Sequence, residues 1–189
     1  SYAEGKARVD DAESVRAELK NEEATHVVSF IGRTHGKIDE KEYPTIDYLE
    51  QKGKLYENVR DNLCAPITLA KICQETNVHY TYLGTGCIFT YDEEHPEGVE
   101  EKGFSENSSA NFFGSGYSTM KGFTDKMMGL FEDTTLNLRI RMPITSKKSS
   151  RNFITKITSY AKVCSIPNSM SVLDELLPQM VSLMERKVT

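Results

Sequence analysis

The sequence of 189 residues is long enough for one domain, or for one domain and part of another. Hydrophobic residues make up 38% of the chain and its net charge is −5, so it can bury a core, and its charge does not support a nucleic-acid partner. No apolar run approaches the ~18 residues that span a bilayer, and the N-terminus lacks the pattern of a signal peptide. We therefore expect a cytoplasmic protein without membrane contact.

The cysteines and histidines give no indication of a metal site or of a disulfide framework. Four cysteines are scattered without a CxxC pair, and the four histidines lack metal-ligand spacing. We expect reduced thiols and no bound metal.

The first part of the chain predicts a helix, a buried strand and a long helix. An aspartate pair precedes a narrow apolar stripe over residues 12–20, which is typical of a capped helix. Residues 26–32 form a short β-branched run closed by glycine, which predicts a buried parallel strand. After a polar loop, residues 55–76 have the apolar spacing of a long helix, which Pro66 is expected to bend.

The second part continues the alternation of strands and helices. Residues 78–89 predict a second strand, and residues 90–110 are rich in Asp, Glu, Gly and Ser, as in a surface loop. The remaining elements are expected as a helix at 112–131, a strand at 136–144, and helices at 151–160 and 171–187, the last kinked or interrupted by Pro178. This alternation predicts an α/β fold with a Rossmann-like, doubly wound parallel sheet.

The Gly-rich turn of a dinucleotide-binding sheet is absent from this sequence. Such a sheet normally begins with a strand and a GxGxxG or GxxGxxG turn that opens a helix. We therefore expect the chain to be an internal piece of a longer enzyme, without the first strand and its turn. Residues 1–150 would be a partial NAD(P)-binding domain, and residues 151–189 the start of a substrate-binding portion with a further helix.

A tyrosine and a lysine on the helix at 112–131 indicate proton chemistry. Tyr117 and Lys121 are four positions apart and therefore share one helix face. A nearby ammonium would lower the pKa of the phenol from its usual value of about 10. Thr85, at the end of the preceding strand, would hold a substrate oxygen against that phenol. Together these residues predict a carbonyl reductase.

Five blocks of sequence carry a resemblance to a known family. They lie at residues 85–89, 117–121, 138–144, 151–157 and 166–170. In order and spacing, they resemble the nucleotide-rhamnose synthase/epimerase-reductases. These are extended short-chain dehydrogenase/reductases related to bacterial dTDP-4-dehydrorhamnose reductase.

The resemblance implies a reaction and a set of catalytic residues. A nucleotide-bound 4-keto-6-deoxyglucose, carried by UDP or dTDP, would be epimerised at C3 and C5 and reduced at C4 with NADPH, or alternatively with NADH. Cys87 would be the base of the epimerisation, and Lys156 its cationic partner and proton donor. Tyr117 would give a proton to the new alkoxide, Lys121 would hold the ribose hydroxyls, and Thr85 would steady the oxygen.

The resemblance also implies residues that bind the cofactor and the substrate. Gly32 would allow the backbone to approach the dinucleotide closely. The other cofactor-binding candidates are Asn62, Tyr117, Lys121, Pro143, Ile144 and, near the end of a presumed earlier strand, Arg8. The candidates for contacts to the sugar or diphosphate are Asn111, Arg141, Arg151 and Asn152.

Other interpretations remain open from the sequence. A nucleotide-sugar 4,6-dehydratase shares the fold, but that family typically follows the threonine with an Asp-Glu pair, where this chain has Gly86 and Cys87. A non-catalytic regulatory or binding subunit could use the same scaffold. Tyr117 and Lys121 could be an ordinary exposed pair, and Cys87 a small buried hydrophobic residue. The broad apolar helix faces allow a homodimer without requiring one.

Overall fold

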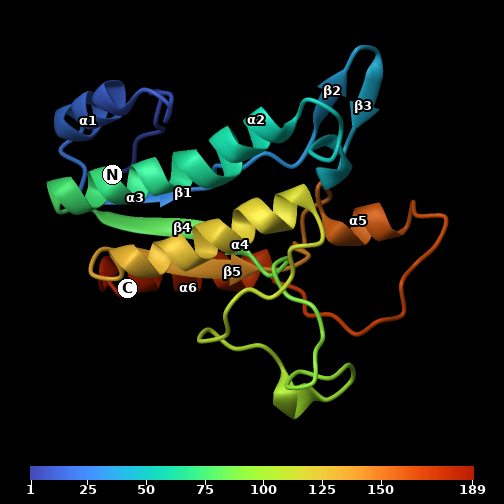
Figure 1. The fold of residues 1–189 in the computed structure, drawn as a ribbon. Helices are drawn as coiled ribbons and strands as arrows, with labels where there is room; N and C mark the ends of the chain where they lie inside the picture. Colours follow the sequence, from blue (N-terminus) through green and yellow to red (C-terminus); the bar gives the residue numbers. More distant parts are fainter.

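The computed structural model describes residues 1–189, and a three-stranded parallel sheet lies at its centre (Figure 1). The central strand β4 (His79–Thr85) pairs with β1 (His26–Ser29) on one side and β5 (Thr135–Ile140) on the other. In this register Val27 lies opposite Tyr80, and Tyr82 lies opposite Asn137. All three strands therefore end at the same edge of the sheet, where ligands of α/β proteins bind.

Helices cover the sheet on both sides, as the alternating sequence pattern predicts. In Figure 1, α4 (Gly116–Met128) lies in front of β5 and α6 (Leu173–Glu185) lies behind it. The helix α3 (Ala65–Thr76) packs beside α4, and α1 (Ala12–Asn21) packs on α3. The predicted α/β class with a Rossmann-like parallel sheet is confirmed.

Two tyrosines on β4 form the middle of the core. Tyr80 and Tyr82 alternate along the strand, so both point to the same face of the sheet, and both are fully buried. They pack in one cluster with Leu69 and Cys73 of α3 and with Met128 of α4. The phenols therefore lie between the sheet and the helices that carry the candidate site.

The long predicted helix contains a π-helical turn where Pro66 interrupts the hydrogen bonding. It begins as α2 (Leu55–Val59), passes through a π-helical turn (Arg60–Cys64) and continues as α3. Pro66 has no amide hydrogen to donate to the carbonyl of Asn62, its partner in a regular α-helix. Thr124 of α4 donates its hydroxyl to that carbonyl at 2.6 Å instead. The interruption thus ties α4 to the turn.

A small hairpin and a 3₁₀ turn follow β1, where the sequence analysis expected only a polar loop. They are β2 (Gly36–Ile38), β3 (Lys41–Tyr43) and the turn Ile46–Tyr48. A Cβ atom at Gly36 would lie 2.4 Å from the Tyr48 ring, so only glycine fits there. Tyr48 packs with Leu49 and Tyr117, which brings the hairpin segment to the start of α4.

The other elements are shorter than predicted, and the last helix is not interrupted at its proline. The helix predicted at 151–160 is limited to α5 (Phe153–Ile157), and 3₁₀ turns occupy Glu100–Lys102 and Gly129–Phe131. The helix α6 continues through Pro178 without interruption. No helix in the structure is both long enough and apolar enough to cross a lipid bilayer.

The C-terminal segment packs back onto the strands. Ile144 pairs with Val172 just before α6, Met180 is buried, and the carbonyl of Val188 lies 2.9 Å from Nε2 of His79 on β4. The division of the chain at residue 150 stays a prediction.

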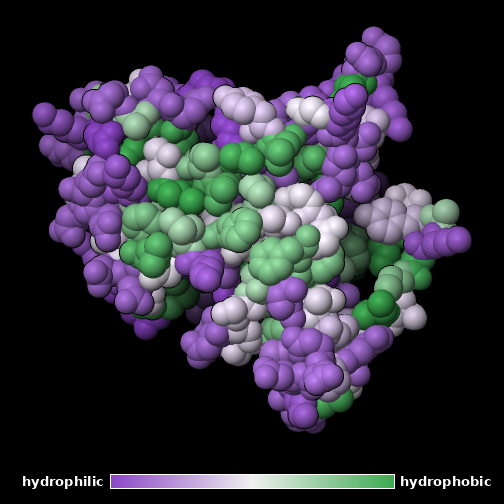
Figure 2. Space-filling model, viewed as in Figure 1, coloured by the Kyte–Doolittle hydropathy of each residue, from purple (hydrophilic) through white to green (hydrophobic).

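Hydrophobic side chains gather on the face that carries α3 and α4 (Figure 2). On α4, Phe123 is 47% exposed, and Leu130, in the 3₁₀ turn that follows, is 69% exposed. These are the broad apolar helix faces that allow a homodimer, which stays a prediction.

Candidate active site at the ends of the strands

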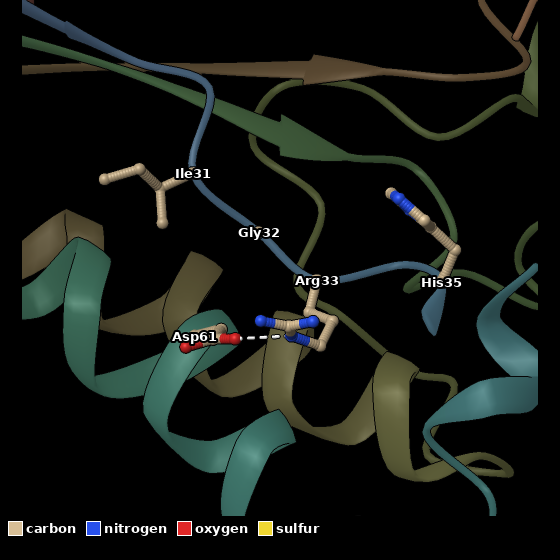
Figure 3. Close-up of a pocket in the computed structure, with 5 residues that line it drawn as sticks. All are labelled: Ile31, Gly32, Arg33, His35 and Asp61. Carbon is tan, nitrogen blue, oxygen red and sulfur yellow. Dashed lines mark hydrogen bonds and ion pairs between the residues drawn. The ribbon is translucent and has the colours of Figure 1, made fainter. Parts of the chain in front are cut away.

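A cavity of about 290 Å³ opens where the chain leaves β1 (Figure 3). It is lined by Ile31, Gly32, Arg33, His35 and Asp61. The side chain of Arg33 points toward the π-helical turn and donates from Nε to Asp61 at 2.6 Å, whereas His35 lies on the other side of the cavity. The hydrogen bond from Arg33 to Asp61 ties the loop after β1 to the π-helical turn, and the backbone around Gly32 lines the cavity.

Gly32 lies where Asn62 and Lys121 meet. A Cβ atom at Gly32 would be 3.1 Å from Oδ1 of Asn62 and 3.1 Å from Nζ of Lys121. The Asn62 amide accepts from the Arg33 amide and donates to the Arg33 carbonyl, both at 3.0 Å. The loop therefore presents bare backbone beside a buried ammonium, an arrangement that suits a dinucleotide.

Lys121 does not lie against Tyr117 as the sequence analysis expected. Its Nζ instead donates to the Tyr82 hydroxyl at 2.9 Å, and the lysine is 95% buried. Burial lowers the pKa of Lys121 to about 8. The helical spacing places Tyr117 and Lys121 on one face, but the long lysine side chain reaches across to β4.

Thr85, Cys87 and Tyr117 come together at the end of β4. Cys87 packs against the cluster that contains Tyr48, Leu49 and Tyr117, and the Cys87 amide donates to Oγ1 of Thr85 at 3.1 Å. Burial raises the pKa of Tyr117, the Cys87 thiol raises it further, and hydrogen bonding by Thr85 acts in the opposite direction. The expectation that a cation lowers this pKa was wrong, because Lys121 bonds elsewhere and the phenol is desolvated. Tyr117 therefore holds its proton at neutral pH.

Two further residues fix this cluster, and the sequence analysis did not identify them. The Ser118 hydroxyl donates to the Cys87 carbonyl at 2.7 Å. The Glu50 carboxylate accepts from the amides of Gly116 and Tyr117 at 3.0 and 3.1 Å, at the N-terminus of α4. A serine beside Tyr117 was visible in the sequence, whereas Glu50 is remote in the chain and gave no signal.

Lys156 lies on α5, outside this cluster. Its ammonium forms no hydrogen bond or ion pair in the structure, and the helix begins at Asn152, whose side chain accepts from the amide of Ile154. No hydrogen bond joins Lys156 to Cys87. Its role as the cationic partner of the thiol stays a prediction.

The four substrate-binding candidates occupy different settings. Arg141 lies next to the cluster, because it donates to the Gly86 carbonyl at 3.1 Å and to Asn168 at 2.9 Å. Arg151 is exposed, with Nη2 3.4 Å from Nε2 of His35. Asn152 is 92% buried, and its amide donates to backbone carbonyls besides capping α5.

Asn111 holds the base of the acidic loop. Its side chain pairs with the amide and carbonyl of Thr90 and donates to Asp92 at 2.7 Å. Arg141, which lies next to the Thr85–Cys87 turn, and Arg151, which is exposed, are therefore the candidates most able to bind a ligand. The side chains of Asn111 and Asn152 are already hydrogen-bonded to other groups of the chain.

The remaining cofactor-binding candidates form contacts with other parts of the chain. The Pro143 carbonyl accepts from the amide of Phe153, and Ile144 pairs with Val172. Arg8 was expected near the end of a strand, but no strand precedes α1. Arg8 is exposed there and paired with Asp10 at 2.8 Å. No group of three or more His, Cys, Asp or Glu side chains is arranged to hold a metal ion.

The parallel sheet, with the helix of Tyr117 and Lys121 beside its strand ends, is similar to the fold of known reductases. A parallel α/β sheet with a Tyr-x-x-x-Lys helix beside its strand ends is typical of the short-chain dehydrogenase/reductases. No family model matches the chain. Its fold is similar to that of dTDP-4-dehydrorhamnose reductase from Bacillus anthracis, solved with NADP. The TM-score is 0.59 and the identity 12%, over 80% of this chain and 46% of that one.

More similar proteins give the relationship in finer detail. The L780 UDP-rhamnose synthase of Acanthamoeba polyphaga mimivirus is 54% identical, with a TM-score of 0.89, over 98% of this chain and 62% of that one. The Arabidopsis thaliana bifunctional dTDP-4-dehydrorhamnose 3,5-epimerase/dTDP-4-dehydrorhamnose reductase is 39% identical over 100% of this chain and 60% of that protein. The chain is therefore a homologue of the nucleotide-rhamnose synthases and epimerase-reductases, and it spans about three fifths of the length of these two relatives.

Proposed function

We propose that the protein is a bifunctional 3,5-epimerase/4-reductase that converts a nucleotide-bound 4-keto-6-deoxyglucose to the L-rhamnose nucleotide with NADPH. The observation that carries the proposal is the convergence of Thr85, Cys87 and Tyr117 at the end of β4. A thiol and a phenol that reach the same space can each exchange a proton with one sugar ring.

The residues around Gly32 fit the dinucleotide that the reduction needs. The cavity of about 290 Å³ that Gly32 helps to line would accommodate a pyrophosphate or ribose near the backbone, and Lys121 would donate to the ribose hydroxyls. When bound, NADPH supplies the hydride that reduces C4. These residues would bind and orient it, whereas Tyr117 handles the proton.

Each residue of the cluster has a role in the proposed chemistry. The ketone at C4 acidifies the hydrogens at C3 and C5, so Cys87, as thiolate, would remove them from one face. Lys156 would return a proton from the other face. Tyr117, which keeps its proton because burial raises its pKa, would then protonate the new alkoxide at C4 while Thr85 steadies that oxygen.

The alternatives are less well supported by the residues at the end of β4. A 4,6-dehydratase would use an Asp-Glu pair after Thr85, where this chain has a glycine and Cys87. A regulatory subunit would not need a thiol, a hydroxyl and a phenol in one group. The choice between UDP and dTDP, the use of NADH, the homodimer and the cytoplasmic location stay predictions.

Incubation of the full-length protein with UDP- or dTDP-4-keto-6-deoxyglucose and NADPH tests the proposal. We expect oxidation of NADPH, formation of the L-rhamnose nucleotide, and solvent deuterium at C3 and C5 of the product. If NADPH is not oxidised, and a parallel incubation with the unmodified hexose nucleotide shows loss of water, the protein is a dehydratase and the proposal is wrong.

A further inference from the structure

The ammonium of Lys121 has a single hydrogen-bond partner inside the protein. Its Nζ donates to the Tyr82 hydroxyl at 2.9 Å, and no carboxylate forms an ion pair with it. Lys121 is 5% exposed and Tyr82 is 1% exposed. A buried ammonium without an acidic partner is costly, so the phenol oxygen is the one group that supports its charge.

The same contact fixes the direction of the lysine. Nζ lies between the Tyr82 hydroxyl and the backbone of Gly32, 3.1 Å from where a Cβ atom of Gly32 would be. An ammonium has three N–H donors, and Tyr82 accepts from one of them. The others are left to serve oxygen atoms on the Gly32 side.

We propose that Tyr82 is a positioning residue for Lys121, whose hydroxyl keeps the ammonium charged and directed at the ribose hydroxyls of a dinucleotide beside Gly32. This inference rests on the proposed function, because it assigns Lys121 to the cofactor. It adds a buried residue from the middle of β4 to the residues that would position the cofactor.

No other charged group near Tyr82 and Lys121 is free to stabilise the ammonium. The titratable groups that face Tyr82 from the packed elements are Tyr80 on β4 and Tyr117 and Asp125 on α4. The π-helical turn presents neutral Asn62, and the guanidinium of Arg33, next to Gly32, is bound to Asp61. Asp125 is itself bound to Arg139 at 2.7 Å, so its charge is already compensated.

Tyr80 offers a matched control. It lies two residues before Tyr82 on the same face of β4, is fully buried, and its hydroxyl has no hydrogen-bond partner. Tyr82→Phe and Tyr80→Phe therefore each remove one phenol oxygen from the same layer of the core, but only the first removes the acceptor of Lys121. Both keep the ring and its packing.

The experiment compares the pH dependence of three full-length proteins. Wild type, Tyr82→Phe and Tyr80→Phe are assayed for kcat/KM in NADPH oxidation and for NADPH affinity. Without its acceptor, Lys121 loses its proton at lower pH. The alkaline limb of the Tyr82→Phe profile should therefore move down by about one pH unit, the size of one hydrogen bond to a charged group. Tyr80→Phe should keep the wild-type profile, and identical profiles for both variants would overturn the inference.

A direct titration separates this inference from the proposed function. The pKa of Lys121 is followed by NMR on protein labelled at the lysine side chains, which needs neither cofactor nor turnover. We expect a lower value in Tyr82→Phe than in wild type and no change in Tyr80→Phe. Inactive wild-type protein with this pattern would refute the function and leave the Tyr82–Lys121 coupling intact.

A second substitution covers the case in which Tyr82→Phe does not fold. A fluorotyrosine at position 82 keeps the ring and the hydroxyl but is a weaker acceptor. It should lower the pKa of Lys121 in the same direction by a smaller amount. An unchanged pKa would overturn the inference.

Discussion

Cys87 and Tyr117 share one space but differ in their surroundings. Tyr117 is 94% buried, with a pKa raised by desolvation, whereas Cys87 is half-buried in the turn after β4. A phenol that holds its proton at neutral pH is suited to donate it. The reduction step would therefore use Tyr117 as an acid, and the base of the epimerisation would be the more accessible thiol.

Cys87→Ser should remove the exchange of sugar hydrogens with solvent. A serine hydroxyl is too weak an acid to act as the base at neutral pH, so deuterium incorporation at C3 and C5 should fall by about 10²–10⁴-fold. Mass spectrometry of the product measures it. Cys73→Ala is the control, because that buried thiol lies in the core away from the cluster. Unchanged exchange in Cys87→Ser would remove Cys87 from the mechanism.

Tyr117→Phe should affect reduction more than exchange. It removes the proton donor for the alkoxide and leaves the thiol in place, so NADPH oxidation should fall by about 10²–10⁴-fold while deuterium still enters at C3 and C5. Both rates are measured on the same samples. A larger loss of exchange than of reduction would contradict the role given to Tyr117.

For individual residues, the sequence predicted contacts between neighbours in the chain better than contacts between distant positions. Thr85 and Cys87 are two residues apart at a strand end, and their partner Tyr117 belongs to a recognisable Tyr-x-x-x-Lys pattern. The contact between Tyr82 and Lys121 spans 39 positions and depends on how far a lysine side chain extends. Arg8 was misplaced because the strand expected before it is absent.

The π-helical turn connects the loop that carries Gly32 to α4, because Asn62 hydrogen-bonds to both Arg33 and Thr124. Pro66 deprives the Asn62 carbonyl of its helical donor, and Thr124 supplies a replacement from α4 at 2.6 Å. The turn is therefore a point of attachment between two helices as well as a local irregularity, in keeping with the common location of such turns at functional sites.

Thr124→Val should destabilise the fold through this attachment. It leaves the buried Asn62 carbonyl without a donor, which costs about 1–3 kcal/mol of unfolding free energy. Urea denaturation measures the loss. Thr76→Val is the control, because the Thr76 hydroxyl bonds only to carbonyls of its own helix. Equal losses in the two variants would show that the attachment contributes nothing.

Element types were predictable where periodicity is strong, and less so where elements are short. The three strands of the sheet and the long helices follow from β-branched runs and apolar spacing. The hairpin β2–β3 has three residues in each strand, too few to show alternation. The continuous course of α6 through Pro178 depends on packing around the helix, because Met180 is buried against the rest of the chain.

The molecule as a whole carries a buried lysine that opposes folding at neutral pH. The pKa of Lys121 falls from 10.5 to about 8 on folding because of burial. Between these values the unfolded chain binds more protons, so the contribution of Lys121 to stability rises with pH. The buried phenols act in the opposite sense, because burial raises the pKa values of Tyr80 and Tyr82.

The difference in unfolding free energy between wild type and Lys121→Met reports the contribution of the lysine alone, because the buried tyrosines are the same in both proteins. The variant should be more stable than wild type near pH 7 by about 3 kcal/mol, and this advantage should narrow by about 2 kcal/mol near pH 9.5. Denaturant unfolding at both pH values measures it. Lys126→Met on the exposed side of the same helix is the control and should show no such dependence. A constant or widening difference would contradict the assignment of a buried charge.

Asn62 connects the loop that carries Gly32 to α4. Its side-chain amide hydrogen-bonds to the backbone amide and carbonyl of Arg33. Its backbone carbonyl accepts a hydrogen bond from Thr124 of α4. The loop and α4 are thereby held by hydrogen bonds to the same residue. A dinucleotide that binds beside Gly32 would therefore meet a loop that is already held in place. Little conformational entropy of that loop would be lost on binding, so little opposes association.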